Sequence, residues 1–192
     1  MMNNRLLFID TETGGLDPQK HSLLTIGIVV WDKKLGELFS DEYAVYSDEY
    51  IVTKSALRIN HFNEEDHRRK AIAPKEIVCK FHEIKENYFQ EFSTIPLAGH
   101  NTTFDIQFLK QLFVACGRSF EKLFSHRIVD TYSVIKFLVD CGYIPNTINS
   151  SAKAFEYFKI SVNGRHTAIG DARATMQLYS ETIRLLNNHI QE

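Results

Sequence analysis

The most informative segment of the chain reads Phe8-Ile9-Asp10-Thr11-Glu12-Thr13-Gly14-Gly15-Leu16. The apolar run that leads into it, residues 5–10, is typical of a short buried β-strand, and the two glycines indicate a turn at its end. Asp10 and Glu12 are two residues apart, so both side chains leave the same face of the strand. Close carboxylates repel one another unless a cation lies between them, and carboxylate oxygens suit Mg²⁺ or Mn²⁺. The pair therefore predicts a metal site, with a polar strand end entering a turn as the alternative.

Two more strands are expected directly after this segment. Residues 23–31 are rich in Ile and Val, and residues 37–46 have a similar strand-like pattern. The Lys-Lys-Leu-Gly stretch between them, residues 33–36, fits a hairpin turn. Three strands joined by short loops indicate an antiparallel meander.

The remainder of the chain alternates helical patterns with short strands. Apolar side chains recur at helical spacing in residues 75–92, 102–116, 131–139, 150–158 and 171–187. Short apolar runs at residues 95–99 and 127–130 read as strands. A meander followed by strand–helix alternation predicts an α/β fold, with a mixed sheet flanked by helices. No repeat or interdomain linker is evident, so residues 1–192 are expected to form a single domain.

Composition excludes several classes of protein. The 192 residues are 44% hydrophobic and 24% charged, which is ordinary for a globular domain and unlike a disordered or fibrous chain. A net charge of −2 argues against a scaffold that coats long nucleic acids through a broad basic surface. The three cysteines form no C-x-x-C pair, so neither a disulfide framework nor a cysteine zinc site is indicated. Without a signal-peptide pattern or an apolar stretch of ~20 residues, a cytoplasmic protein with no membrane partner is expected.

A second segment, His100-Asn101-Thr102-Thr103-Phe104-Asp105, opens a strongly predicted helix. Asp105 falls in the first turn of this helix, on the same face as Leu109 and Leu112. An aspartate on an apolar stripe needs a partner or a cleft. The helix dipole also favours an acid in the first turn, but that explains its place along the helix better than the face it occupies.

A third segment, His166-Thr167-Ala168-Ile169-Gly170-Asp171, precedes the last predicted helix. Asp171 is expected to start that helix, where an N-cap role would be an ordinary reason for its presence. His166 is expected in the loop just before, and a solvent-exposed loop histidine is the default interpretation for a chain with eight histidines. Neither residue is decisive by itself.

In chain order the three segments read Asp-x-Glu, then Asp, then His-x-x-x-x-Asp. This order resembles the signature of the DEDD exonucleases, in the histidine-containing branch that includes the epsilon proofreading subunit of bacterial replicative polymerase and ribonuclease T. The resemblance extends over about residues 6–186. The tyrosine branch of the family would place a tyrosine four residues before the last aspartate, where this chain has Thr167.

The resemblance implies a ribonuclease-H-like fold with a five-stranded mixed sheet, and a 3′→5′ exonuclease activity that releases 5′-mononucleotides. Asp10 would bridge two Mg²⁺ or Mn²⁺ ions, as in other two-metal sites. Glu12 and Asp171 would complete the site on the nucleophile side, and Asp105 would help to hold the ion on the leaving-group side. His166 would act as the general base that takes a proton from the attacking water.

The resemblance also suggests which residues contact the terminal nucleotide. They are Thr11, Thr13, Gly14, Leu16, Phe62, Asn101 and Phe104. The first three would act through backbone groups of the turn, and Leu16 would act as an apolar wedge. Asn101 would orient the second segment. The two phenylalanines could stack on or pack near a base, which is a sequence-tolerant contact, although core packing would account for either ring equally well.

Three alternatives concern substrate, activity and partners. The opening motif resembles the DNA-processing members, so single-stranded DNA 3′ ends are preferred, with RNA 3′ ends as the alternative substrate. A nuclease-like binding module without activity should have lost one of the acids or the histidine, and all are present. A proofreading or DNA repair role would require a polymerase or repair partner. Because such subunits usually carry an extra polymerase-binding tail, a stand-alone enzyme is favoured, and a homodimer would be compatible with the sequence.

Overall fold

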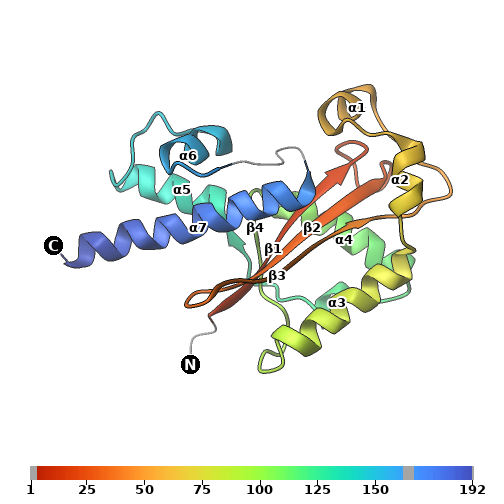
Figure 1. Cartoon of the computed structure of the whole chain (residues 1–192), viewed down its shortest axis with the longest axis horizontal. Coiled ribbons are helices and arrows are strands. Elements are labelled where there is room, and N and C mark those ends of the chain that lie inside the picture. The colour runs from red at the N-terminus through yellow and green to blue at the C-terminus, as the bar shows by residue number, and fades with distance from the viewer. Residues whose placement is uncertain (1–3, 162–166, 192) are drawn as a thin grey trace.

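The computed structural model describes residues 4–161 and 167–191, built around a five-stranded sheet of order β3-β2-β1-β4-β5 (Figure 1). The strands are β1 (Arg5–Thr13), β2 (Leu23–Asp32), β3 (Gly36–Ala44), β4 (Leu97–Gly99) and β5 (Val129–Asp130). β1, β2 and β3 pair antiparallel in chain order. β4 runs parallel to β1, and β5 runs parallel to β4. The predicted meander and the mixed sheet are therefore confirmed.

Helices cover both faces of the sheet (Figure 1). They are α1 (Lys54–Asn60), α2 (Glu64–Lys70), α3 (Pro74–Tyr88), α4 (Thr103–Ala115), α5 (Thr131–Asp140), α6 (Ser151–Tyr157) and α7 (Ala168–Gln191). α3 and α4 pack on one face, whereas α7 lies across the other face with α5 and α6 beside it. Among the helices of the described residues, none is both long and apolar enough to cross a bilayer.

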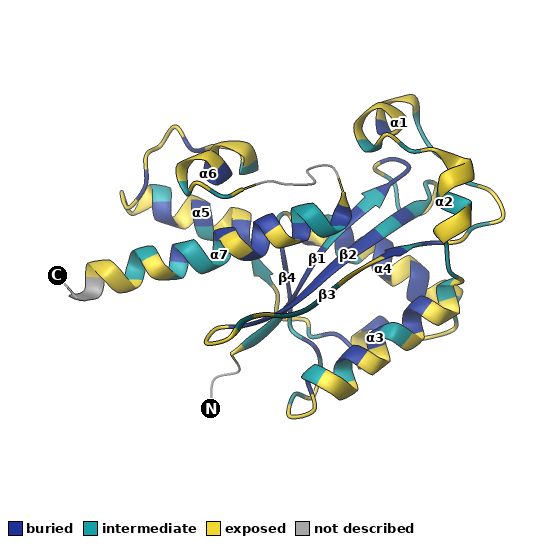
Figure 2. Ribbon diagram, in the orientation of Figure 1, coloured by how far each residue is buried: buried dark blue, intermediate teal, exposed yellow. Residues whose placement is uncertain are grey.

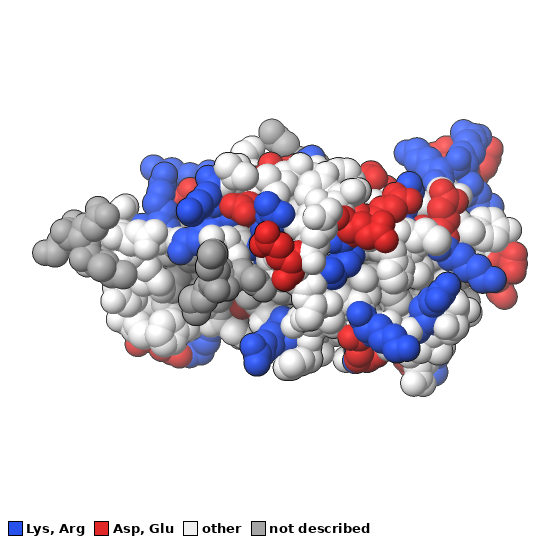
Figure 3. All heavy atoms as spheres, turned by 90° about the horizontal axis from the view of Figure 1, so that it is seen from below, with Lys and Arg blue, Asp and Glu red and all other residues white. Residues whose placement is uncertain are grey.

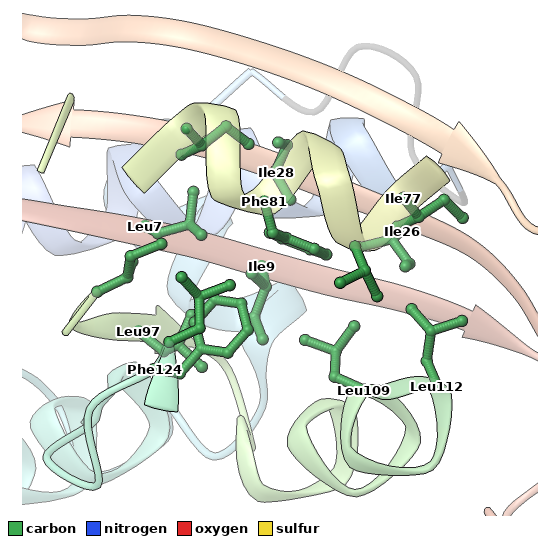
Figure 4. Close-up of a cluster of buried hydrophobic side chains, with 14 of the residues drawn as sticks. Leu7, Ile9, Ile26, Ile28, Ile77, Phe81, Leu97, Leu109, Leu112 and Phe124 are labelled. Carbon is green, nitrogen blue, oxygen red and sulfur yellow. The ribbon is translucent and has the colours of Figure 1, made fainter. Parts of the chain in front are cut away.

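The alternation of side chains along β1 divides the core into two layers. Leu7 and Ile9 belong to the cluster that contains Phe81 of α3 and Leu109 of α4 (Figure 4). Phe8 points to the opposite face, where it belongs to the cluster packed under α7. All five of these side chains are at most 1% exposed, and full burial of a side chain of this size contributes about 1.5–3 kcal/mol. The apolar half of β1 therefore anchors both layers.

Gly27 in β2 allows α7 to approach the sheet closely. A Cβ atom at this position would lie 2.1 Å from the carbonyl carbon of Ala168, the first residue of α7. That distance is far below van der Waals contact, and the obstacle is backbone that cannot rotate away. Only glycine therefore permits the start of α7 to rest directly on β2 at this point.

Two of the element boundaries that differ from the sequence-based expectation belong to the elements that carry Asp10 and Asp171. β1 continues to Thr13 and not only to Asp10, because its polar residues stay paired with β2, with a register shift between Glu12 and Thr13. α7 begins at Ala168, before the expected start at Asp171. The Thr167 hydroxyl accepts the Gly170 N–H at 3.1 Å and so caps the helix at that earlier point. Asp171 consequently lies within the first turn of α7.

The segment around Phe62, where the sequence predicted no helix, joins two short helices, α1 and α2. Thr53 caps α1 and Asn63 caps α2 through their side chains. Both helices are largely exposed (Figure 2), and α2 buries none of its residues. A side-chain cap stabilises each helix, and ion pairs also stabilise α2, so neither helix depends on an apolar stripe.

Candidate active site

Asp10 and Glu12 of β1 meet Asp171 of α7 at the end of the sheet. One carboxylate oxygen from each residue lies within 4.8 Å of the others, and all three residues are half-buried. The period of the strand places the first two on the α7 face, and the close approach of α7 over Gly27 brings in the third. The structure thus brings together three of the four acids that the sequence indicated.

Asp105, the fourth acid, approaches from α4 and has a different environment. It is 4% exposed, and its Oδ1 accepts a hydrogen bond from the Thr11 hydroxyl at 2.7 Å. Thr11 lies between Asp10 and Glu12 in β1, so its side chain points to the opposite face of the strand, toward α4. The predicted role of Thr11 was a backbone contact with a nucleotide. Its side chain holds Asp105 beside the other acids, and the backbone contact stays a prediction.

The electrostatics of the cluster are unfavourable when the acids are ionised. Burial raises the pKa of Asp10 well above its ordinary value, and the negative charges of Asp105, Asp171 and Glu12 raise it further. Burial, followed by the charges of Asp171 and Glu42, raises the pKa of Glu12 from 4.5 to about 7. Burial also raises the pKa of Asp105, against the opposing hydrogen bond from Thr11. The fold therefore holds together carboxylates that repel one another.

The donor set of the three-acid cluster fits a small divalent cation. Oxygens bound to one Mg²⁺ at 2.0–2.1 Å lie at most about 4.2 Å apart, and the three carboxylate oxygens here lie within 4.8 Å. Small rotations of the side chains would bring all three oxygens to one ion. A cation would also remove the repulsion that raises the pKa values of Asp10 and Glu12.

The turn after β1 is held by hydrogen bonds within the protein. The Thr13 hydroxyl donates to the Gly15 carbonyl at 2.8 Å, and the Thr13 carbonyl accepts from the Asn60 side chain at 2.9 Å. The Gly14 N–H donates to the Ser22 carbonyl at 2.7 Å, and the Gly14 carbonyl accepts from the Thr53 N–H at 2.7 Å. These bonds fix Thr13 and Gly14 against α1, and the predicted contacts of their backbone with a nucleotide stay predictions.

A cleft of about 250 Å³ opens beside Glu12, between the sheet, the α1–α2 region and the start of α7. Its lining includes Glu42, Phe62, His67 and Thr167. The half-buried Phe62 ring packs edge-on against Tyr50, with 5.4 Å between the ring centroids. The structure thus places Phe62 on the wall of a cleft that reaches the acid cluster. Leu16, at 84% exposure, projects from the turn into solvent.

The start of α4 is oriented by Asp130 of β5. Its carboxylate accepts the backbone N–H groups of Asn101 at 3.3 Å and Thr102 at 3.0 Å. Asn101 has a left-handed backbone with φ of 57° and is exposed. Asp130 thus orients this segment through its backbone, and the role predicted for Asn101 stays a prediction. Phe104, in the first turn, is half-buried and packs against Phe108 with 5.2 Å between the ring centroids.

Sequence reasoning did not single out Glu42 of β3. Its Oε2 accepts the Ile169 N–H at 2.9 Å, and its charge contributes to the raised pKa of Glu12. No local signal marks it, because an acid on an edge strand is usually a solvated side chain. His166, the predicted general base, lies outside the described residues, so its role stays a prediction.

Charged side chains of both signs are distributed over the surface. On the face in Figure 3, Lys and Arg side chains are interspersed with Asp and Glu side chains. Around α2, Arg68 pairs with Glu64 at 2.8 Å, and Arg69 pairs with Glu65 at 2.5 Å. Acids of the same helix thus partly neutralise these two arginines, which agrees with the absence of a strongly basic overall charge.

Solved structures with a similar fold include Escherichia coli exonuclease I. In its complex with a dT13 oligonucleotide, it superposes with a TM-score of 0.78 at 16% identity, covering 98% of this chain and 43% of that chain. Its product-bound structure superposes with a TM-score of 0.74. The chain therefore spans less than half the length of exonuclease I. The shared fold confirms the predicted ribonuclease-H-like architecture.

Sequence comparison gives a consistent result. The DNA polymerase III subunit epsilon of Treponema pallidum is 27% identical over 174 residues, which cover 91% of this chain and 74% of that protein. The 3′-5′ exonuclease DinG of Staphylococcus saprophyticus is 26% identical over 178 residues, covering 88% of this chain and 17% of that protein. The family model named RNase_T, exonuclease, matches residues 7–179, which include the three segments that carry the resemblance. The chain therefore belongs to the RNase_T exonuclease family, as its motifs indicated.

Proposed function

We propose that residues 1–192 act as a single metal-dependent exonuclease domain, which removes nucleotides from the 3′ ends of single-stranded nucleic acid, with DNA preferred. The observation that carries the proposal is the meeting of Asp10, Glu12 and Asp171 beside a cleft. Three mutually repelling carboxylates at a cleft are poorly explained by folding stability, because the charge of Asp171 raises the pKa values of both Asp10 and Glu12.

Asp10, Glu12 and Asp171 would hold one Mg²⁺ or Mn²⁺ ion, and Asp105 together with Asp10 would hold a second. Such ions stabilise the developing charge on the attacking and leaving oxygens of a phosphodiester. The protein's part is to keep four acids at one strand end, with Thr11 fixing Asp105 in place. The oxygen-only donor set favours these ions over softer metals.

The remaining roles concern the nucleotide and the proton. The cleft beside Glu12 would receive the terminal nucleotide, with Phe62 on its wall and Leu16 projecting near the turn. His166 would accept the proton of the attacking water, because its neighbour Thr167 lines the same cleft and histidine titrates near neutral pH. The product would be a 5′-mononucleotide.

The preference for DNA rests on the relatives. Four of the related sequences are named as DNA polymerase III subunit epsilon, and exonuclease I was solved with a DNA oligonucleotide. A polymerase or repair complex is accordingly the partner class we propose, and a homodimer is the form to test alongside it. RNA 3′ ends form the competing substrate class, since the acids act on a phosphate common to both.

The test uses 5′-labelled single-stranded DNA and RNA of the same sequence, incubated with the protein and Mn²⁺ or EDTA. The wild-type protein should shorten DNA from the 3′ end in single-nucleotide steps with Mn²⁺ and leave it intact with EDTA. Asp10→Ala and His166→Ala should abolish the ladder. Asp140→Ala and His82→Ala, which change exposed residues of the same types away from the site, should behave like wild type.

Each outcome has a distinct meaning. Faster shortening of RNA would replace DNA by RNA as the preferred substrate. Full activity of His166→Ala would remove the histidine from the mechanism while leaving the metal site intact. Intact substrates with every metal and end tested, despite retained binding, would overturn the enzyme and favour a binding module.

A further inference from the structure

We propose that Glu42 of β3 is a positioning residue, whose carboxylate anchors the first turn of α7 and thereby places Asp171 against Asp10 and Glu12. The inference rests on the metal site of the proposed function, and it assigns to that site a residue from a strand that contributes none of the four acids. Three features of the structure support it: the cross-strand arrangement, the hydrogen bond, and the flanking contacts of α7.

Asp10, Gly27 and Glu42 form one row across three strands. Asp10 of β1 pairs with Gly27 of β2, and Gly27 pairs with Glu42 of β3. Side chains of directly paired residues lie on the same face of a sheet, so Asp10 and Glu42 both point toward α7. Gly27 between them has no side chain, and the backbone of Ala168 occupies that space. The start of α7 therefore lies in a gap with a carboxylate on either side.

The carboxylate of Glu42, on the β3 side, accepts a hydrogen bond directly from α7. The first N–H groups of a helix have no acceptor within the helix. In α7 the Gly170 N–H donates to the Thr167 hydroxyl, whereas the Ile169 N–H donates to Glu42 Oε2 at 2.9 Å. Ile169 precedes Asp171 by two residues, so this bond fixes the turn that carries the acid.

A second contact with β3 lies on the other side of Asp171. The Arg173 guanidinium donates to Glu37 at 3.1 Å and to the Ser40 hydroxyl at 2.5 Å. Since this pair is largely exposed, it contributes less than its geometry suggests. The edge strand thus contacts α7 at residues 169 and 173, which flank residue 171.

Apolar packing alone would not position Asp171. Ala172 and Met176 press α7 onto the sheet, but apolar contact is non-directional and tolerates small shifts. A hydrogen bond loses its strength when its geometry changes. Glu42 also carries a charge that disfavours ionised Glu12, so a role as an anchor accounts for its presence better than a contribution to the charge of the site.

The experiment separates the hydrogen bond from the charge. Glu42→Gln removes the charge and keeps an acceptor of the same length, whereas Glu42→Asp keeps the charge and is too short to reach the Ile169 N–H. Mn²⁺ affinity is measured by calorimetry without nucleic acid, beside Glu42→Ala and the exposed control Glu49→Ala. We expect Glu42→Gln and Glu49→Ala to bind Mn²⁺ within about twofold of wild type. Glu42→Asp and Glu42→Ala should bind about tenfold more weakly, as for other residues that orient metal ligands.

Two further measurements distinguish a positioning role from unfolding and from substrate binding. Thermal melting shows whether each variant is folded. If Glu42→Ala is unfolded, the comparison of Glu42→Gln with Glu42→Asp is sufficient for the test. With labelled single-stranded DNA, Glu42→Asp should lower kcat and leave KM nearly unchanged, because Asp171 would hold the ion that acts on the reacting phosphate.

Several results would overturn the inference. If Glu42→Asp binds Mn²⁺ like wild type and Glu42→Gln binds weakly, the charge matters and the hydrogen bond does not. A raised KM with unchanged Mn²⁺ affinity would make Glu42 a substrate contact. If wild type binds no Mn²⁺, the proposed metal site fails and the inference fails with it. If wild type and every variant bind Mn²⁺ with the same affinity, the inference about Glu42 fails and the proposed metal site stands.

Discussion

The two halves of β1 are equivalent in backbone structure and opposite in side-chain chemistry. Both halves pair with β2 in one antiparallel register, from Arg5 opposite Asp32 to Glu12 opposite Thr25. In the first half, residues 7–9 are at most 1% exposed and join the two core layers. In the second half, Asp10 and Glu12 are half-buried acids with raised pKa values.

The difference arises from what lies beside each half. β4 pairs with Leu7 and Phe8 of the first half. Beyond that pairing, the starts of α4 and α7 bring Asp105 and Asp171 toward β1. The apolar half supplies stability, and the acidic half concentrates like charge at a cost in stability. Substitutions in the two halves should therefore act on different properties of the protein.

The largest expected effect is on activity, from Asp10→Asn in the acidic half. Metal ions contribute several kcal/mol of transition-state stabilisation, and each 1.4 kcal/mol is a factor of ten. The rate of nucleotide release should therefore fall by roughly 10³-fold or more. In EDTA the melting temperature should rise, because one of the repelling charges is removed. Activity within tenfold of wild type, beside Asp140→Asn as control, would show that the acidic half is not the catalytic one.

The second effect is on stability, from Leu7→Ala in the apolar half. Loss of a fully buried leucine side chain lowers the free energy of unfolding by about 2–5 kcal/mol. Urea denaturation measures this loss, and the 71%-exposed Leu35→Ala is the matched control, expected to change stability by about 0.5 kcal/mol or less. Mn²⁺ binding by the folded fraction should be retained. If Leu7→Ala is as stable as wild type but binds no Mn²⁺, the apolar half of β1 affects metal binding and not stability, contrary to the proposed difference between the halves.

The third effect is a decrease in the free energy of unfolding of the metal-free protein as pH rises. Glu12 has a pKa of about 7 in the folded protein against 4.5 ordinarily, so between these values the native state binds more protons than the unfolded state. Its stabilising contribution is complete below about pH 4.5 and is lost as pH rises through 7. At about 1.4 kcal/mol per pKa unit, the loss is on the order of 1–3 kcal/mol.

Melting in EDTA from pH 5 to pH 8 measures this loss, and Glu12→Gln is the comparison. The variant lacks the titrating group and should lose less stability over the same range. Mn²⁺ should restore the wild-type melting temperature most strongly above pH 7, where Glu12 is ionised. An equal decline in both proteins would mean that other groups are responsible.

The smallest effect is expected from Thr11, whose hydroxyl donates to Asp105 at 2.7 Å. Thr11→Val keeps the shape and removes the donor, at a cost of about 1 kcal/mol, so kcat should fall by about fivefold. Thr11→Ser keeps the hydroxyl and should retain most of the wild-type kcat. If the two variants are equally impaired, packing of the methyl group and not the hydrogen bond accounts for the role of Thr11.

The sequence predicted the meander and the mixed sheet because these depend on local periodicity, whereas the gathering of the acids followed from the family resemblance. Asp10 and Glu12 share a face through the two-residue period of a strand, and Asp105 lies in the first turn of a helix whose apolar stripe is evident. The short helices α1 and α2 escaped prediction because seven residues held by caps and ion pairs leave no apolar stripe to detect.

By itself the sequence determined which acids are candidates for the metal site and on which face of each element they lie. Only the tertiary structure decided how they are held: Gly27 beneath Ala168, Thr11 against Asp105, and Glu42 bound to Ile169. Glu42 and Ile169 are 127 positions apart in the chain. Such a contact depends on how the edge strand and the last helix pack, whereas the local patterns depend on residues a few positions apart. The sequence encodes both the long-range contacts and the local patterns, but only the local patterns can be recognised without knowledge of the fold.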